Sequence, residues 1–169
     1  RKLGGVPEYC RSGHSLIKAR MKEVNALFAG ELSGHMFFAD EYYGFDDSFY
    51  AAGRLLRILS HETQPLSVLL SGVPKYPGTD EVRIDCADDR KFDVIDRIRD
   101  AALRDHDAIT VDGVRVLYPD GWGLVRASNT QPVLVARCEG KDAKSLERIS
   151  ADMRRRIVDQ GIPSFEWSY

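Results

Sequence analysis

The sequence predicts an α/β and α+β protein in two parts, the second of which is an open antiparallel sheet with helices packed on one face. Three observations lead to this prediction. Apolar residues recur at helical spacing in the first part, polar and apolar residues alternate in several segments of the second, and two Asp-Gly pairs follow such segments. Between the parts, residues 73–78 hold two prolines and a glycine, which predicts a linker at 74–78 and domains at 1–73 and 79–169.

The first part is expected to contain a helix, two short strands and two further helices. In the first helix, Ile17 and Met21 recur at helical spacing, and Ser12 or Ser15 is the expected N-cap. The second helix is expected to be capped within the acidic segment 46–48. The expected elements lie, in chain order, at residues 15–28, 29–32, 36–38, 49–59 and 65–72.

The second part is expected to follow the order βαββββα. Asp112-Gly113 joins two of its segments and is a strong hairpin signal. Short turns make such strands antiparallel. In a domain with an antiparallel sheet and few helices, the helices are expected to pack together on one face of the sheet. The expected elements lie at residues 81–86, 91–103, 108–111, 114–118, 123–128, 133–138 and 144–158.

The composition indicates a globular protein with reduced thiols. The 169 residues are 43% hydrophobic and 30% charged, with a formal net charge of −2. This balance gives no argument for nucleic acid or a membrane surface as partner, and no apolar run reaches the roughly 20 residues of a membrane span. Three widely spaced cysteines without a CxxC pair predict no disulfide framework, no metal site and a cytoplasmic protein. The N-terminus lacks the apolar core of a signal peptide, and its start without Met suggests that it is not a natural N-terminus.

A carboxylate, a hydroxyl and an imidazole lie within residues 31–35, between apolar flanks. Alternation along a strand would place Glu31, Ser33 and His35 on one side and Leu32 on the other. A carboxylate can accept hydrogen bonds from two neighbouring sugar hydroxyls, and an imidazole can transfer a proton near neutral pH. The alternative is a polar turn whose side chains bind only local backbone.

A second polar segment begins at Arg126 and lies between two apolar strands. The guanidinium, the side chains of Ser128, Asn129 and Thr130, and a run of backbone N–H groups could form an anion-binding concavity. The alternative is an ordinary hairpin turn with the arginine on a solvated face.

His14 and Lys18 share a helix face because they are four residues apart. His14 lies near the helix N-terminus, where unpaired N–H groups favour anions. The simpler interpretation is a capping histidine and a solvent-exposed lysine. The acidic pairs Asp40-Glu41 and Asp46-Asp47 could bind a cation, but surface acidity and helix capping explain them more simply.

Together these motifs resemble the phosphomannomutase/phosphoglucomutase family of the alpha-D-phosphohexomutase superfamily. The combination of a Glu-x-Ser-Gly-His loop with an Arg-Ala-Ser-Asn-Thr-x-Pro loop is specific, and the matching stretches run through almost the whole chain. Those stretches are residues 12–18, 30–38, 45–47, 112–115 and 120–132.

The resemblance implies the later part of an α/β/α third domain followed by a complete fourth domain with a TATA-box-binding-protein-like sheet. It also implies a parent enzyme that interconverts hexose 1-phosphate and 6-phosphate, of mannose or glucose, through a hexose 1,6-bisphosphate. By the same resemblance, Glu31 and Ser33 bind sugar hydroxyls, and His35 is a candidate general acid/base. The remaining substrate-binding residues that it implies are His14, Lys18, Arg126, Ser128, Asn129 and Thr130, the last four at the phosphate that is not transferred.

Two parts of the family's machinery do not occur in this sequence. The family's phosphoserine and Mg²⁺ ligands lie in its first two domains, and no Asp-x-Asp-x-Asp spacing occurs here. The isolated chain is therefore expected to be inactive, with a phosphosugar and the N-terminal domains of the same protein as partners. An alternative is a non-catalytic sugar-phosphate-binding module. A nucleic-acid-binding sheet is less well supported, because few paired aromatic residues and no basic face are evident.

Overall fold

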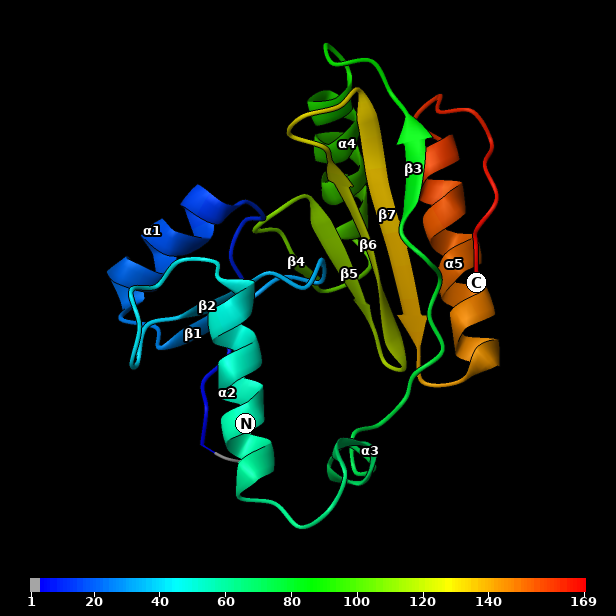
Figure 1. The fold of residues 1–169 in the computed structure, drawn as a ribbon. Helices are drawn as coiled ribbons and strands as arrows, with labels where there is room; N and C mark the ends of the chain where they lie inside the picture. The colour runs from blue at the N-terminus through cyan, green and yellow to red at the C-terminus, as the bar shows by residue number, and fades with distance from the viewer. Residues whose placement is uncertain (1–3) are drawn as a thin grey trace. The chain divides into compact units, whose positions relative to one another are not determined.

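The computed structural model describes residues 4–169, which form two compact units (Figure 1). Unit 1 ends at Pro74, and unit 2 comprises Lys75–Tyr169. Each unit has its own buried apolar cluster. Among the described residues, no helix combines the length and the apolar character needed to cross a membrane.

Unit 1 contains three helices and a two-stranded hairpin. The first helix is shorter than expected, because Asn25 adopts a left-handed conformation with φ 52° and its N–H closes the last turn on the Met21 carbonyl. The expected serine N-cap is wrong: the N-cap residue is Gly13, which has no side chain to form a cap hydrogen bond. Asp47 caps the second helix as expected, accepting a hydrogen bond from the Tyr50 N–H at 2.9 Å. The elements are α1 (His14–Val24), β1 (Phe28–Gly30), β2 (Met36–Phe38), α2 (Ser48–Ser60) and α3 (Leu66–Leu69).

The segment between β1 and β2 is a turn and not a continuation of the strand. Phe28 pairs with Phe38 and Gly30 with Met36 in the antiparallel register, and the Glu31 N–H bonds the His35 carbonyl at 2.9 Å. Gly34 has φ 92°, a conformation that side chains rarely adopt. The expected strand alternation at residues 31–35 is therefore wrong.

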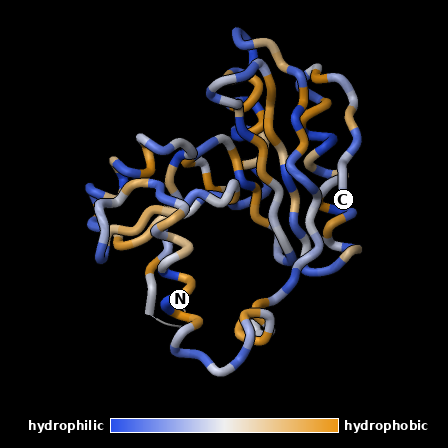
Figure 2. Tube along the Cα trace, viewed as in Figure 1, coloured by the Kyte–Doolittle hydropathy of each residue, from blue (hydrophilic) through white to orange (hydrophobic). Residues whose placement is uncertain are grey.

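The core of unit 1 is small. Ile17, Met21 and Phe37 are buried, while α2 and α3 contain no buried residue. Apolar side chains on α2 are exposed instead, among them Phe49 at 89% and Leu56 at 65%, and Figure 2 shows hydrophobic residues along both helices. An apolar face of this kind is typical of a surface that another element covers.

Unit 2 confirms the expected βαββββα order and the open antiparallel sheet. The strand order is β3-β7-β6-β5-β4, with antiparallel pairing throughout, and α4 and α5 both pack on one face of the sheet (Figure 1). The elements are β3 (Val82–Asp85), α4 (Lys91–Ala102), β4 (Ala108–Ile109), β5 (Val114–Tyr118), β6 (Gly121–Ala127), β7 (Val133–Gly140) and α5 (Ala143–Val158).

Alternation along β6 decides which side chains face away from the helices. Gly123 faces α5 so closely that a Cβ there would lie 2.3 Å from Met153 Cγ. Trp122 and Arg126 consequently lie on the open face, while Val125 is buried beneath the helices. On this face, the Arg115 guanidinium lies over the Trp122 ring, 3.9 Å from the ring centre.

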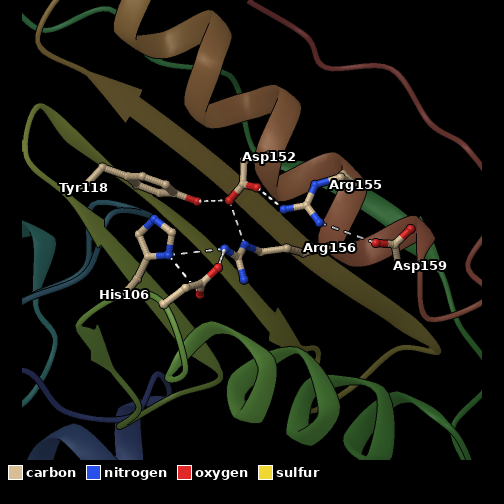
Figure 3. A network of polar contacts seen from close by, with 7 residues as sticks. His106, Tyr118, Asp152, Arg155, Arg156 and Asp159 are labelled. Carbon is tan, nitrogen blue, oxygen red and sulfur yellow. Dashed lines mark hydrogen bonds and ion pairs between the residues drawn. The ribbon is translucent and has the colours of Figure 1, made fainter.

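A buried ionic network joins α5 to the end of β5 (Figure 3). Arg156, whose side chain is only 6% exposed, donates to Asp152 at 2.7 Å and to Asp105 at 2.8 Å. Tyr118 donates its hydroxyl to Asp152 at 2.6 Å. Burial opposes ionisation of Asp152, but the hydrogen bonds from Tyr118 and Arg156 outweigh it and keep the pKa of that carboxyl below its usual value. The hydrogen bond from Arg156 lowers the pKa of Asp105 to about 2.

Replacing Asp152 with asparagine is expected to lower the free energy of unfolding of unit 2 by about 2–4 kcal/mol, because it leaves the buried Arg156 charge poorly compensated. Urea unfolding followed by tryptophan fluorescence measures this, since the two tryptophans, Trp122 and Trp167, both lie in unit 2. The control is Asp159→Asn, at an exposed ion pair with Arg155, where we expect a change below about 0.5 kcal/mol. Equal stabilities of the two variants would contradict the role of the network.

The same network predicts a direction of pH dependence. A carboxyl whose pKa is lowered by folding stabilises the fold above its unfolded value, near pH 4, and loses that contribution as the pH falls. Wild-type unit 2 is therefore expected to lose stability between about pH 4 and pH 2 more steeply than Asp152→Asn.

Candidate functional site

Three separate segments of unit 1 bring four polar side chains together. His14 is the first residue of α1, Glu31 and His35 flank the hairpin turn, and Asp46 lies beside β2, bridged to Phe37. The ring centres of His14 and His35 are 4.3 Å apart, in an edge-on arrangement. We call His14, Glu31, His35 and Asp46 the hairpin cluster.

Within the hairpin cluster, His35 and Asp46 form a hydrogen-bonded pair. His35 Nδ1 lies 2.7 Å from Asp46 Oδ2, and Asp46 Oδ1 accepts the Met36 N–H at 3.2 Å. The hydrogen bond from His35 lowers the pKa of Asp46. An ionised Asp46 requires the proton on His35 Nδ1, which assigns the tautomer and leaves Nε2 to exchange a proton with a ligand.

Glu31 is held at the start of α1. Its Oε1 accepts the Gly13 N–H at 3.1 Å, and its Oε2 lies 3.9 Å from His14 Nε2. This carboxylate thus holds the N–H of the N-cap residue at the start of α1, and its side chain is 17% exposed. Ser33 lies exposed in the turn.

Lys18 is not part of the hairpin cluster. It is exposed one turn along α1 and lines a groove of about 430 Å³ with Met21, Lys22 and Tyr43. The acidic pair Asp40-Glu41 is also separate, because Asp40 pairs with Arg54 and Glu41 with Arg57. Those two ion pairs agree with the simpler interpretation of surface acidity.

In unit 2, the turn between β6 and β7 carries the second group of candidate residues. Ser128 is 8% exposed, and its Oγ accepts the N–H groups of Thr130 and Gln131 at 3.3 and 3.2 Å. These two N–H groups therefore point into the turn, contrary to the expected concavity of free backbone donors. Asn129 and Thr130 are exposed.

Arg126 lies beside this turn on the open face of the sheet. Its side chain is half-buried, and within residues 4–169 no carboxylate lies at ion-pair distance from it. The arginine therefore has a donor fork available for an external anion.

Two residues of these sites lay outside the sequence-based candidates. Asp46 was predicted only as part of an acidic pair that could bind a cation or, more simply, cap a helix, and its partner His35 lies 11 positions away. Lys91 was predicted only as the start of a helix, yet it is buried and its Nζ donates to the Gln131 carbonyl at 3.0 Å. No local spacing in the sequence indicates either contact.

The donor atoms of His14, His35 and Asp46 all lie within 4.8 Å of one another. Two imidazoles and one carboxylate suit a transition metal, whereas Mg²⁺ takes oxygen ligands. This donor set therefore does not fit magnesium. Burial raises the pKa of the Cys86 thiol, and it raises that of Cys138 to about 12, which disfavours either as a nucleophile.

Two family models match the chain in tandem. Residues 1–76 match "Phosphoglucomutase/phosphomannomutase, alpha/beta/alpha domain III", and residues 81–156 match "Phosphoglucomutase/phosphomannomutase, C-terminal domain". A solved structure of a phosphoglucomutase/phosphomannomutase family protein from Burkholderia thailandensis superposes with a TM-score of 0.85 at 42% identity, covering 99% of this chain and 35% of that one.

Curated relatives give the same match. A phosphomannomutase/phosphoglucomutase of Pseudomonas aeruginosa is 48% identical over 163 residues, which is 95% of this chain and 35% of that protein. A phosphoglucomutase of Neisseria gonorrhoeae is 41% identical over 170 residues, covering 99% and 36%, respectively. The chain thus spans about a third of the length of these relatives.

Proposed function

Because the chain belongs to the phosphoglucomutase/phosphomannomutase family, we propose that it is the C-terminal part of an enzyme that interconverts hexose 1-phosphate and hexose 6-phosphate through a bisphosphorylated sugar. In this proposal, unit 1 binds the sugar ring and unit 2 binds the phosphate that is not being transferred. The observation that carries the proposal is the hairpin cluster, which places an oriented acid/base imidazole beside a fixed carboxylate.

Recognition of the sugar is assigned to Glu31 and Ser33. The Gly13 N–H fixes one carboxylate oxygen of Glu31, which leaves the other to accept hydrogen bonds from ring hydroxyls. Ser33 lies exposed two residues further along the turn and can donate or accept one hydrogen bond. His14, 3.9 Å from Glu31, lines the same side, and Lys18 lies one helical turn away.

Proton transfer is assigned to His35. As a sugar hydroxyl oxygen attacks the phosphorus of the phosphoserine that the family resemblance implies, its proton moves to His35 Nε2, and the serine oxygen leaves with the electron pair of the broken P–O bond. Asp46 stabilises the resulting imidazolium. In the reverse direction the imidazolium returns that proton to the sugar oxygen as its bond to phosphorus breaks. The Mg²⁺ that the family resemblance implies would stabilise charge on the transferred phosphoryl group, and its ligands would lie outside this chain.

Phosphate binding is assigned to Arg126 together with Ser128, Asn129 and Thr130. Arg126 supplies a planar pair of donors with no competing carboxylate among residues 4–169. The Ser128 hydroxyl hydrogen remains free to donate, because its oxygen is the acceptor in the turn. The exposed side chains of Asn129 and Thr130 add further donors.

The exposed apolar face of α2 fits a place inside a larger protein. Phe49 and Leu56 expose most of their side chains, and α3 contains no buried residue. We propose that further residues of the same parent enzyme cover this face, which would remove apolar surface from water.

A second candidate function is a non-catalytic sugar-phosphate-binding module. It is favoured by one observation: the sequence contains no Asp-x-Asp-x-Asp run to hold the magnesium of a phosphoryl transfer. Mutase activity of an intact enzyme that contains this chain would exclude this alternative.

Titration of the ¹⁵N-labelled chain with glucose 1-phosphate tests the proposed binding roles. We expect the amide signals of residues 31–35 and 128–131 to shift together, whereas inorganic phosphate shifts only residues 128–131 and glucose at equal concentration shifts neither group strongly. Arg126→Ala is expected to abolish the phosphate-dependent shifts. Shifts confined to other surfaces of the chain would refute both assigned sites.

A further inference from the structure

We propose that Lys91 is a positioning residue for the phosphate-binding turn: its buried ammonium holds the Gln131 carbonyl from the helix side of the sheet. The phosphate then approaches from the side of Arg126, and Lys91 does not touch it. This inference rests on the phosphate role proposed above for Arg126 and residues 128–130.

The burial of Lys91 is unusual for this chain. Its side chain is 6% exposed, whereas the other lysines within residues 4–169 are all exposed. Removing an ammonium from water is unfavourable unless hydrogen bonds and a counter-charge replace the hydration. Lys91 Nζ has a carboxylate oxygen of Asp88 at 2.6 Å, the Gln131 carbonyl at 3.0 Å and the Phe92 ring centre at 5.3 Å.

The ion pair with Asp88 does not account for this burial. The Asp88 side chain is 70% exposed and three residues away, so a solvent-exposed lysine could form the same weak pair. The contact that burial makes possible is with Gln131, which lies 40 positions along the chain. The buried ammonium is therefore explained by the turn that it holds.

Two further contacts join the same segment to the turn. The Cys86 N–H donates to the Pro132 carbonyl at 2.9 Å, and the Arg83 guanidinium donates to the Gln131 side chain. The turn is thus held from both faces of the sheet: by Arg83 from the open face, opposite to Val82 and Ile84, and by Lys91 from the helix side. The Lys91 charge behind the Gln131 peptide also favours an anion on the opposite side of the turn.

Lys91→Met in the 169-residue chain separates this role from general packing. Methionine keeps most of the apolar length of the side chain but removes the ammonium, so that of the two donors to the Gln131 carbonyl only the Val133 N–H, at 2.8 Å, remains. We expect hydrogen exchange at the Thr130 and Gln131 amides to accelerate about 10-fold, which corresponds to about 1.4 kcal/mol, while core amides of β6 and β7 keep their protection. Binding of glucose 1-phosphate, measured by the same amide signals, is expected to weaken about 5- to 20-fold.

Lys144→Met is the matched control, because Lys144 is exposed in the first turn of α5 and the charge change is identical. We expect Lys144→Met to change neither hydrogen exchange at the turn amides nor the affinity for glucose 1-phosphate. Lys91→Arg retains charge and donors and is expected to restore most of the turn protection. If Lys91→Met unfolds unit 2 as a whole, Lys91→Arg and Lys91→Gln are compared instead. Slower hydrogen exchange at residues 129–131 in Lys91→Arg than in Lys91→Gln supports the positioning role, and equal exchange contradicts it.

Turn amides that stay as protected in Lys91→Met and Lys91→Gln as in the wild type would overturn the positioning role. A wild-type chain that fails to bind glucose 1-phosphate, combined with turn amides that lose protection in Lys91→Met, supports the positioning role and refutes the phosphate role of the turn. The two readouts therefore distinguish failure of this inference from failure of the proposed function.

Discussion

Replacing His35 with alanine in an intact enzyme that contains this chain is expected to lower kcat by about 10²- to 10⁴-fold, the usual contribution of a positioned general acid/base. KM is expected to change only a few-fold, because the substrate contacts proposed for Glu31 and the β6–β7 turn are unchanged in this variant. The physical basis is the 2.7 Å contact that assigns the Nδ1 proton and leaves His35 Nε2 for the sugar hydroxyl. Steady-state kinetics with glucose 1-phosphate and mannose 1-phosphate measure both constants.

Asp46→Asn tests the partner of His35 separately. It preserves the shape of the side chain but removes the negative charge that stabilises the imidazolium, so we expect an intermediate loss in kcat of about 10- to 100-fold. His61→Ala is the control, since His61 lies at the end of α2, outside the assigned site. A His35→Ala enzyme with the kcat of the wild type would show that the proton moves elsewhere.

The fold of unit 2 was predictable because its strands alternate in burial and its turns have strong signals. Asp112-Gly113 sits at the β4–β5 turn, and Gly113 has φ 71°, as such turns require. Unit 1 was less predictable, because the boundary of α1 depends on the conformation of one residue, Asn25, and the hairpin turn on Gly34. Propensity does not determine such single-residue conformations.

The candidate residues were predictable as types, but their contacts were not. Glu31 and His35 were candidates because of their chemistry, yet the expected strand geometry was wrong and the turn brings them to His14 instead. Asp46 and Lys91 gain their roles from contacts 11 and 40 positions away. Contacts at that separation depend on the tertiary fold, which a single sequence does not specify locally.

Arg126→Ala in the intact enzyme is expected to raise KM about 30- to 150-fold with little change in kcat, which corresponds to about 2–3 kcal/mol for a lost arginine–phosphate contact. Stability should be nearly unaffected, because no ion pair of Arg126 exists within residues 4–169 to be broken. Arg126→Lys keeps the charge but loses the planar fork, so an intermediate KM is expected. Arg97→Ala, at an exposed pair with Asp93, is the control.

The proposed reaction adds a symmetry requirement to the Arg126 prediction. A bisphosphorylated sugar that returns either phosphate must be held with either end at the same phosphate-binding turn. Arg126 contacts only the phosphate in this scheme, so Arg126→Ala should raise the KM for hexose 1-phosphate and for hexose 6-phosphate by the same factor. The KM of each hexose phosphate is measured with the reaction run in both directions. A rise in KM for one substrate alone would mean that the turn recognises one end of the sugar and not the phosphate group.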